Sequence, residues 1–279
     1  MSREELPAAL WPLGDIAGNY VEVAGVRSYF ESCGSGPAVL LLHTAGRDNR
    51  QWQWVMDLLR DEFTLYAPDL PGHGKSWPRH GEPCLNDVSE MADWLLEFMS
   101  AVGQETFLVA GTSLGGNLAL LLPASSARVR GTLALQGADL TPTISETALD
   151  LMSHPQVSLP HSNMDFSLSL VGERAHHGAR SFIEWGVSSL SPLAQQSDLR
   201  AYTRCDIREL MRNVTCPVIM AHGDRDWLVS RRMVDDTATR LINARSLEMV
   251  SLRGIGHFPH VESPLEVAAL VRKLGTSVE

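Results

Sequence analysis

The chain has 279 residues, of which 44% are hydrophobic and 20% charged, so it suits one large globular domain or a domain with an insertion. Its formal net charge of −10 and its lack of any basic run argue against a nucleic-acid partner, because phosphate binding needs clustered positive charge. The first residues, MSREELPAALWPLGD, lack a signal-peptide pattern, and no apolar run reaches the roughly 18 to 20 residues of a membrane span. Four scattered cysteines without a C-x-x-C predict reduced thiols, so we expect a cytoplasmic protein with no membrane partner.

Taken in chain order, the predicted elements alternate between strand and helix. An alternating segment that turns at Gly25 predicts a leading hairpin, and short, wholly apolar runs after it predict strands covered on both faces. The apolar runs lie at 38–42, 63–70, 106–111, 131–137, 217–224 and 246–254, and helix-like segments lie at 50–61, 86–102, 231–242 and 264–274. This alternation predicts the α/β class, with a mostly parallel eight-stranded sheet flanked by helices.

One long gap interrupts the alternation between residues 141 and 215. These roughly 75 residues contain no convincing strand, and they are too many for a structureless loop in a compact domain. Apolar side chains occur along the gap at Met152, Met164, Phe166, Phe182 and Trp185. We therefore expect residues 141–215 to form a helical cap inserted into a core domain of residues 1–140 and 216–279.

The stretch FLVAGTSLGGNLALLL, from Phe107 to Leu122, passes directly from a strand pattern to a helix pattern at Ser113. A sharp turn there would strain the backbone of the serine and crowd its neighbours, and the glycines at 111 and 115 meet that need. The turn would lift the hydroxyl above the carboxyl edge of the sheet, over a helix N-terminus that favours developing negative charge. The pattern predicts a nucleophile elbow, G-x-S-x-G, and a serine that only caps the helix is the alternative.

Two later loops offer the partners that a weak serine nucleophile needs, which are a base and a group that orients the base. The segment AHGDRDWLV places Asp224 and Asp226 at the carboxyl end of a predicted strand. The segment LRGIGHFPHVESP places His257 in a loop before the final helix. The chain order of serine, aspartate and histidine is the order expected for a nucleophile elbow on such a sheet.

Five segments together resemble the α/β-hydrolase superfamily, of the kind with a lid inserted after the sixth strand: LLHTAG, APDLPGHGKS, GTSLGG, HGDRDWLV and GIGHFPHVESP. The resemblance covers nearly the whole chain from about Val21 onward. It implies that Ser113 is the nucleophile, Asp226 the acid and His257 the base.

The resemblance also implies an oxyanion hole formed by the backbone N–H groups of Leu114 and Ala45. At position 44 the chain departs from the family pattern, because Thr44 replaces the usual glycine after the histidine. The threonine hydroxyl could add a contact to the substrate.

Two other aspartates compete for the role of the acid. Asp224 lies two residues from Asp226 and could point at His257 instead. Asp139 follows the preceding strand, where some relatives place their acid.

The remaining histidines have simpler interpretations. We expect His260 to line the mouth of the site, His73 to bridge loop backbone and His43 to order the loops beside it. The adjacent His176 and His177 cannot converge easily on one ion and have no nearby carboxylate, so we expect no metal there.

The predicted chemistry is acyl transfer to water on a small-molecule ester or lactone, with no cofactor and no metal. Relatives that cleave carbon–carbon bonds in ring-fission products often carry asparagine and tryptophan where this chain has Thr112 and Phe258, and that alternative stays open. So do a non-hydrolytic lyase, a cyclase and a ligand receptor. Oligomeric state is left open, with a homodimer as one outcome. The residues expected to contact substrate are Thr44, Phe166, Phe182, Trp185 and Phe258.

Overall fold

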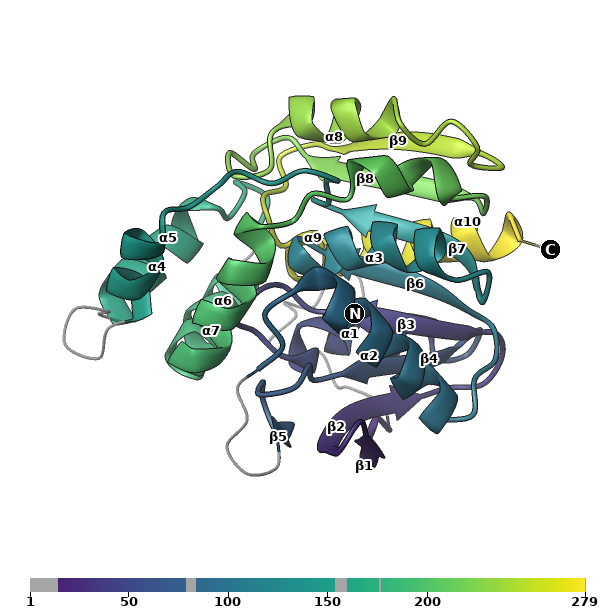
Figure 1. Ribbon diagram of the computed structural model, residues 1–279, viewed down its shortest axis with the longest axis horizontal. Helices are drawn as coiled ribbons and strands as arrows, with labels where there is room; N and C mark the ends of the chain where they lie inside the picture. Colours follow the sequence, from purple (N-terminus) through teal and green to yellow (C-terminus); the bar gives the residue numbers. More distant parts are fainter. Residues whose placement is uncertain (1–14, 79–83, 154–159, 176, 279) are drawn as a thin grey trace.

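A computed structural model describes residues 15–78, 84–153, 160–175 and 177–278 as a central sheet flanked by helices (Figure 1). The strands are β1 (Ala17–Val23), β2 (Val26–Cys33), β3 (Ala38–Leu42), β4 (Thr64–Pro68), β5 (Trp77–Pro78), β6 (Phe107–Thr112), β7 (Val129–Leu135), β8 (Val218–Gly223) and β9 (Leu247–Leu252). The α-helices are α1 (Gln53–Leu59), α2 (Val88–Ala101), α3 (Leu114–Ser125), α4 (Glu146–Ser153), α5 (Pro160–Ser169), α6 (His177–Ser188), α7 (Pro192–Thr203), α8 (Arg231–Ala238), α9 (Pro259–Glu262) and α10 (Pro264–Thr276). Two short 3₁₀ helices are η3 (Asn49–Trp52) and η5 (Arg208–Asn213).

The sheet runs in the order β1-β2-β4-β3-β6-β7-β8-β9, and the short β5 pairs with β2. The pairs β1–β2 and β2–β4 are antiparallel, whereas every pair from β4 to β9 is parallel. These eight main strands confirm the predicted mostly parallel α/β sheet. The leading hairpin turns through Ala24 and Gly25, whose φ angles of 49° and 77° suit a tight two-residue turn.

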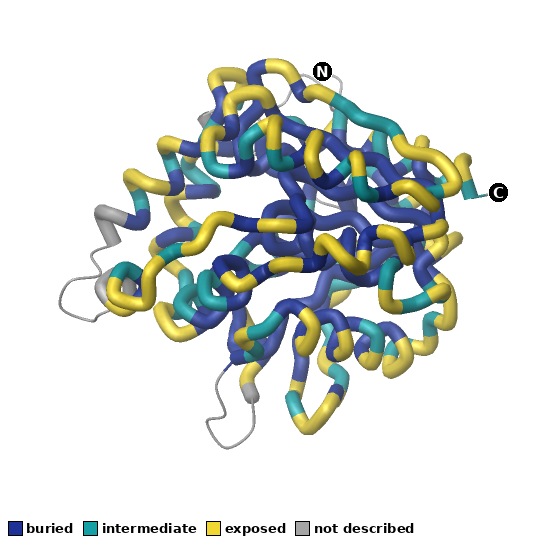
Figure 2. Tube along the Cα trace, turned by 45° about the horizontal axis from the view of Figure 1, so that its top comes forward, coloured by how far each residue is buried: buried dark blue, intermediate teal, exposed yellow. Residues whose placement is uncertain are grey.

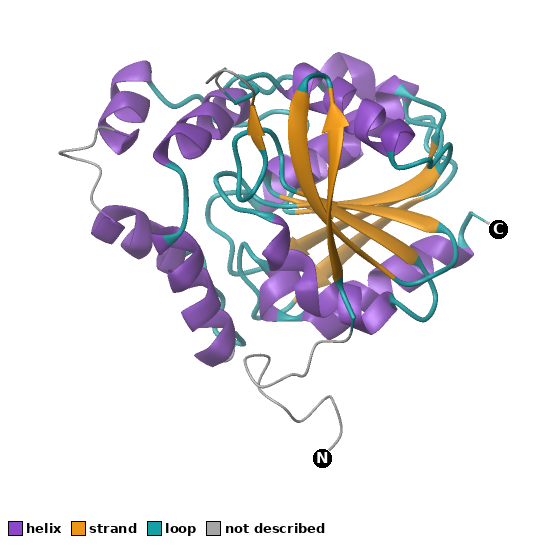
Figure 3. Ribbon diagram, turned by 90° about the horizontal axis from the view of Figure 1, so that it is seen from below, coloured by secondary structure: helices purple, strands orange, loops and turns teal. Residues whose placement is uncertain are grey.

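Burial explains the apolar runs in the sequence. Every residue of β3, β6 and β8 is buried, because helices cover both faces of the sheet (Figures 2 and 3). One hydrophobic cluster joins α2, α3 and α8 to the sheet, and a second joins α1 and α10 to its other face.

The segment between β7 and β8, residues 141–215, is called the insert below. Its helices α4 to α7 lie to one side of the sheet (Figures 1 and 3), and Leu140 and Asp206 form an isolated bridge where the insert leaves and rejoins the core. The structure adds β5 and shortens the helix expected at 50–61, which starts as η3 and continues as α1. No helix in the described residues is long and apolar enough to cross a membrane.

Candidate active site

Ser113 occupies the single residue between β6 and α3, at the carboxyl edge of the sheet. Its φ of 59° and ψ of −118° lie in a sparsely populated region, which costs about 1 to 3 kcal/mol and is typical of functional sites. Ser113 stands at the N-cap position of α3, yet its side chain makes no capping hydrogen bond. The hydroxyl is therefore not engaged in stabilising the helix end.

The glycines beside Ser113 are required by close backbone approaches. A Cβ atom on Gly111 would lie 2.0 Å from the carbonyl oxygen of Gly115, and one on Gly115 would lie 2.4 Å from that of Leu42. Because backbone cannot move aside easily, only glycine fits at either position.

His257 is held by a carboxylate from the neighbouring strand end. Its Nδ1 donates to Asp226 Oδ2 over 2.7 Å, and both side chains are buried. The other oxygen of Asp226 accepts the backbone N–H groups of Leu228 at 2.8 Å and Val229 at 3.3 Å. These bonds fix the tautomer of His257 so that Nε2 is left unprotonated and able to accept a proton.

The two competing aspartates have other partners. Asp224 Oδ1 accepts the backbone N–H of Gly254 at 2.7 Å, on the partly exposed side of the loop. Asp139 is buried against Arg240 and accepts from Thr237. The structure thus brings Asp226, rather than Asp224 or Asp139, to His257.

The loop that carries His257 is fixed from two sides. From the insert, the carbonyl of Leu170 accepts the backbone N–H of His257 at 2.8 Å. From α9, the buried carboxylate of Glu262 accepts the N–H groups of Gly256, Phe258 and Gly172 at 2.8 to 2.9 Å. Burial raises the pKa of Glu262 even though these three donors act to lower it.

Of the two expected oxyanion residues, Leu114 is the first residue of α3 and Ala45 lies in the loop after β3. Thr44 anchors this loop, because both its N–H and its hydroxyl donate to Gln51 Oε1, at 3.0 and 3.1 Å. The chain then turns tightly, so that the Arg47 N–H donates to the Thr44 carbonyl. Among the described residues, neither the Ala45 nor the Leu114 N–H has a protein acceptor. Two unengaged donors of this kind are what an oxyanion hole needs.

A carboxylate from the insert holds this turn in place. Asp198 Oδ2, on α7, accepts the N–H of Gly46 at 2.7 Å and the Nε2–H of His73 at 2.8 Å. His73 bonds through Nδ1 to the carbonyl of Pro71, so both ring nitrogens face acceptors, an arrangement that favours the cationic ring. Burial lowers the pKa of His73, but the charge and hydrogen bond of Asp198 outweigh it, and the pKa is raised overall. His73 thus bridges loop backbone, as expected, and also forms a buried ion pair with the insert.

His43 and His260 are buried neutral rings. His43 bonds to the Thr44 carbonyl and accepts the Leu70 N–H, and burial lowers its pKa to about 4. His260 bonds to the Thr112 hydroxyl and packs on Trp52, and burial lowers its pKa to about 3. The sequence suggested that His260 lines the mouth of the site. The structure instead places it in the interior.

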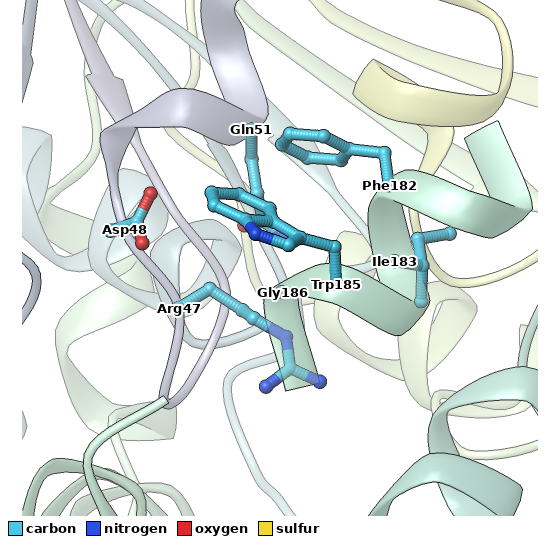
Figure 4. Close-up of a pocket in the computed structure, with 7 residues that line it drawn as sticks. All are labelled: Arg47, Asp48, Gln51, Phe182, Ile183, Trp185 and Gly186. Atoms are coloured by element: carbon cyan, nitrogen blue, oxygen red, sulfur yellow. The ribbon is translucent and has the colours of Figure 1, made fainter. Parts of the chain in front are cut away.

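A cavity of about 250 Å³ joins the predicted residues. Of the five expected substrate contacts, Thr44, Phe166 and Phe258 line this cavity, as do Ala45, an expected oxyanion residue, and the pair Ser113 and His257. Phe182 and Trp185 instead line a second pocket with Arg47 and Gln51 (Figure 4). The complete lining of the Ser113 cavity is Thr44, Ala45, Arg47, Ser113, Ile144, Phe166, Ser167, Leu170, Gln195, Leu199, Tyr202, Leu228, His257 and Phe258.

Metal ligation has no candidate within the described ranges, where no three His, Cys, Asp or Glu side chains converge. His176 lies outside the described residues, and nothing is described of the His177 side chain, so the expectation for that pair stays a prediction.

Sequence reasoning missed three charged residues at the site, which are Arg47, Asp198 and Glu262. Arg47 ends the tight turn that starts at Thr44, and Glu262 follows His257 by five residues, so their places in the two motifs were available signals. Asp198 lies in the middle of the insert, and no local pattern marks it.

Comparison with known proteins shows which family the chain is similar to. The model of the alpha/beta hydrolase family matches residues 39–270. A pimeloyl-[acyl-carrier protein] methyl ester esterase from Nitrosomonas europaea is 24% identical over 85% of this chain and 94% of the esterase. An enol-lactonase structure from Burkholderia xenovorans has a TM-score of 0.82 at 18% identity, covering 92% of this chain and all of the lactonase.

A shorter match is stronger in identity. An uncharacterized protein of Mycobacterium tuberculosis is 35% identical over 114 residues, which is 40% of this chain but only a third (33%) of that protein's length. Because the family model spans most of the sequence, from the first buried parallel strand into the last helix, the chain belongs to the alpha/beta hydrolase family.

Proposed function

We propose that the chain hydrolyses a small-molecule ester or lactone through an acyl-enzyme formed on Ser113. One observation carries the proposal. Ser113, whose hydroxyl makes no capping hydrogen bond at a strained elbow, shares a cavity with His257, which donates to the buried Asp226. The esterase and the lactonase among the similar proteins support this reaction class.

The chain's own groups account for each proton transfer. His257 Nε2 takes the proton of the Ser113 hydroxyl as Oγ bonds to the substrate carbonyl carbon. The bond to the leaving oxygen then breaks, and His257 gives that oxygen the proton. Water repeats the sequence on the acyl-enzyme, releasing the carboxylic acid and restoring Ser113. In a lactone the leaving oxygen stays on the acyl chain, so the product is a hydroxy acid.

Charge that develops on the carbonyl oxygen would be met by the N–H groups of Ala45 and Leu114. Losing one such donor typically costs about 3 to 4 kcal/mol of transition-state stabilisation. Asp226 stabilises the imidazolium that forms on His257, and burial strengthens that interaction because little water screens it.

A serine-directed fluorophosphonate tests the proposal. We expect one adduct by intact mass, mapped to Ser113, together with turnover of p-nitrophenyl butyrate or γ-butyrolactone that Ser113→Ala abolishes. Ser167→Ala is the matched control, because Ser167 lines the same cavity but bonds to Arg47. Labelling at Ser167, or turnover that survives Ser113→Ala, would refute the assignment. A protein that binds ligands without reacting would give no adduct.

A further inference from the structure

Arg47 brings a permanent positive charge to the Ser113 cavity. It lies two residues beyond Ala45, at the end of the tight turn that starts at Thr44. Of the described residues that line the cavity, none is acidic, and Arg47 is the one permanent cation. The residue as a whole is only 9% exposed.

The guanidinium has little to neutralise it. Nη2 donates to the Ser167 hydroxyl at 2.9 Å, and no other hydrogen bond of this side chain occurs in the described part of the protein. The neighbouring Asp48 is already bonded through both carboxylate oxygens to Arg50. No carboxylate among the described residues lies within ion-pairing distance of Arg47, and residues 154–159 and 176 of the insert include no acid.

Figure 4 shows the Arg47 side chain running away from the Asp48 carboxylate and past Gly186 of α6. A Cβ atom on Gly186 would lie 3.6 Å from Arg47 Cδ. The aliphatic part of the Arg47 side chain is therefore enclosed between the turn at residues 44–47 and the insert.

Burial without a partner is costly for a charge. The penalty for removing an ion from water is several kcal/mol, and attraction to an opposite charge normally offsets it. Burial lowers the pKa of Arg47 to about 10, which still leaves the group charged at neutral pH. Within the described ranges, one neutral hydroxyl and the charge of Asp48, which is shared with Arg50, do not offset this penalty, so the cavity can accommodate an anion from the substrate.

We propose that the ester or lactone carries a carboxylate, which Arg47 binds as the scissile carbonyl sits at Ser113. This rests on the proposed function and narrows its substrate class to small acidic esters or lactones. A planar guanidinium presents parallel N–H donors that match the two oxygens of a carboxylate. The cavity of about 250 Å³ is smaller than the pockets of drug-sized ligands, which suits a compact half-ester of a dicarboxylic acid.

A pair of probes that differ only in charge tests the proposal. The anionic probe is p-nitrophenyl hemiglutarate, and the neutral probe carries a carboxamide in place of its free carboxylate. We expect the unmodified protein to prefer the anionic probe in kcat/KM. Arg47→Met should reduce that preference by about 100-fold, a loss typical of truncating one partner of a buried charge pair. Arg204→Met is the control, because Arg204 lies outside the cavity and pairs on the surface with Glu146, and it should leave the preference unchanged.

Binding of glutarate itself, measured by calorimetry, separates this proposal from the proposed function. Glutarate that binds the unmodified protein and not Arg47→Met supports the anion site even when no ester is turned over. Esters turned over without any charge preference, with glutarate unbound, would overturn the anion site and leave the hydrolase assignment intact.

Stability gives a further reading. Arg47→Met removes an uncompensated buried charge, so its melting temperature should equal or exceed that of the unmodified protein. A large fall in melting temperature, with the same loss on both probes, would make Arg47 a structural clamp and overturn the proposal. Arg47→Lys keeps the charge but loses the paired N–H donors of the guanidinium. We expect its preference for the anionic probe to lie between those of the unmodified protein and Arg47→Met.

Discussion

The carboxyl edge of the sheet and the insert hold their functional side chains by different means. At the sheet edge, Ser113 and His257 are positioned by backbone hydrogen bonds and by glycines with no room for a side chain. The insert contacts the loop after β3 through a few polar side chains: Asp198 accepts the Gly46 N–H, and Ser167 accepts from Arg47. Under the proposed function, rigid backbone therefore positions the reacting side chains, whereas the insert acts through contacts that single substitutions can alter.

The largest expected effect of a single substitution, a loss of kcat, lies at the sheet edge. Asp226→Asn should lower kcat by about 10⁴, because an asparagine would hold His257 in the wrong tautomer. Asp224→Asn, two residues away, should cost far less, since Asp224 bonds to the Gly254 N–H and not to His257. Steady-state kinetics on one chromogenic ester measures both. The reverse ranking would mean that the acid has been misassigned.

The next effect, on stability, is expected at the buried ion pair between Asp198 of the insert and His73. Asp198→Asn should lower the free energy of unfolding by about 3 kcal/mol, because it leaves the His73 cation buried without its partner. Glu146→Gln is the matched control on the insert surface, where the exposed ion pairs with Arg200 and Arg204 are screened by water, so it should leave the free energy of unfolding nearly unchanged.

The pH dependence of that effect follows from the raised pKa of His73. A group whose pKa is higher in the folded state stabilises the fold fully below its unfolded pKa of about 6.5. The stabilisation is lost as the pH rises through the higher folded value. The gap between the unmodified protein and Asp198→Asn should therefore narrow as the pH increases, measured by urea denaturation across pH 6 to 9. A gap that widens with pH would contradict the charged pair.

Two glycines compare the rigidity of the two regions. Gly115→Ala should destabilise by about 3 kcal/mol, since its Cβ would lie 2.4 Å from a backbone oxygen. Gly186→Ala in α6 meets nothing closer than 3.6 Å and should stabilise by about 0.5 to 1 kcal/mol through helix propensity. Thermal unfolding of both variants decides the comparison. Equal effects would show that the elbow can relax as freely as the insert.

The last prediction concerns substrate selection by aromatic residues of the insert. Phe166→Ala should change kcat/KM unequally across acyl groups of different size, by about 10-fold to 200-fold, as expected for pocket contacts. Phe182→Ala is the control, because Phe182 packs on Trp54 and lines the second pocket. A panel of esters and lactones measures both variants. If Phe166→Ala slowed every substrate by one factor, with unchanged stability, Phe166 would have no part in selection.

The sequence predicted the sheet and the order of the site residues because both depend on local patterns. Continuous apolar runs match strands buried on both faces, and G-x-S-x-G encodes a turn whose geometry admits only small neighbours. The partners of Asp198 and Arg47 could not be found in this way. Gly46 lies 152 residues from Asp198, and Arg47 lies 120 residues from Ser167. The pocket that Phe182 and Trp185 line could not be predicted either, because an aromatic residue in a helical pattern does not show which of two pockets it faces.

The contact between the insert and the His257 loop has a consequence for chimeras. The Leu170 carbonyl bonds to the His257 N–H, and Gly172 approaches the next turn so closely that a Cβ would lie 2.4 Å from the Gly254 oxygen. A transplant of residues 141–215 from a homologous enzyme would therefore replace a support of His257 along with helices α4 to α7. We expect grafts that retain the native stretch 170–174, with breakpoints on either side of it, to keep turnover. Exchanges of the whole segment should lose it even when they fold.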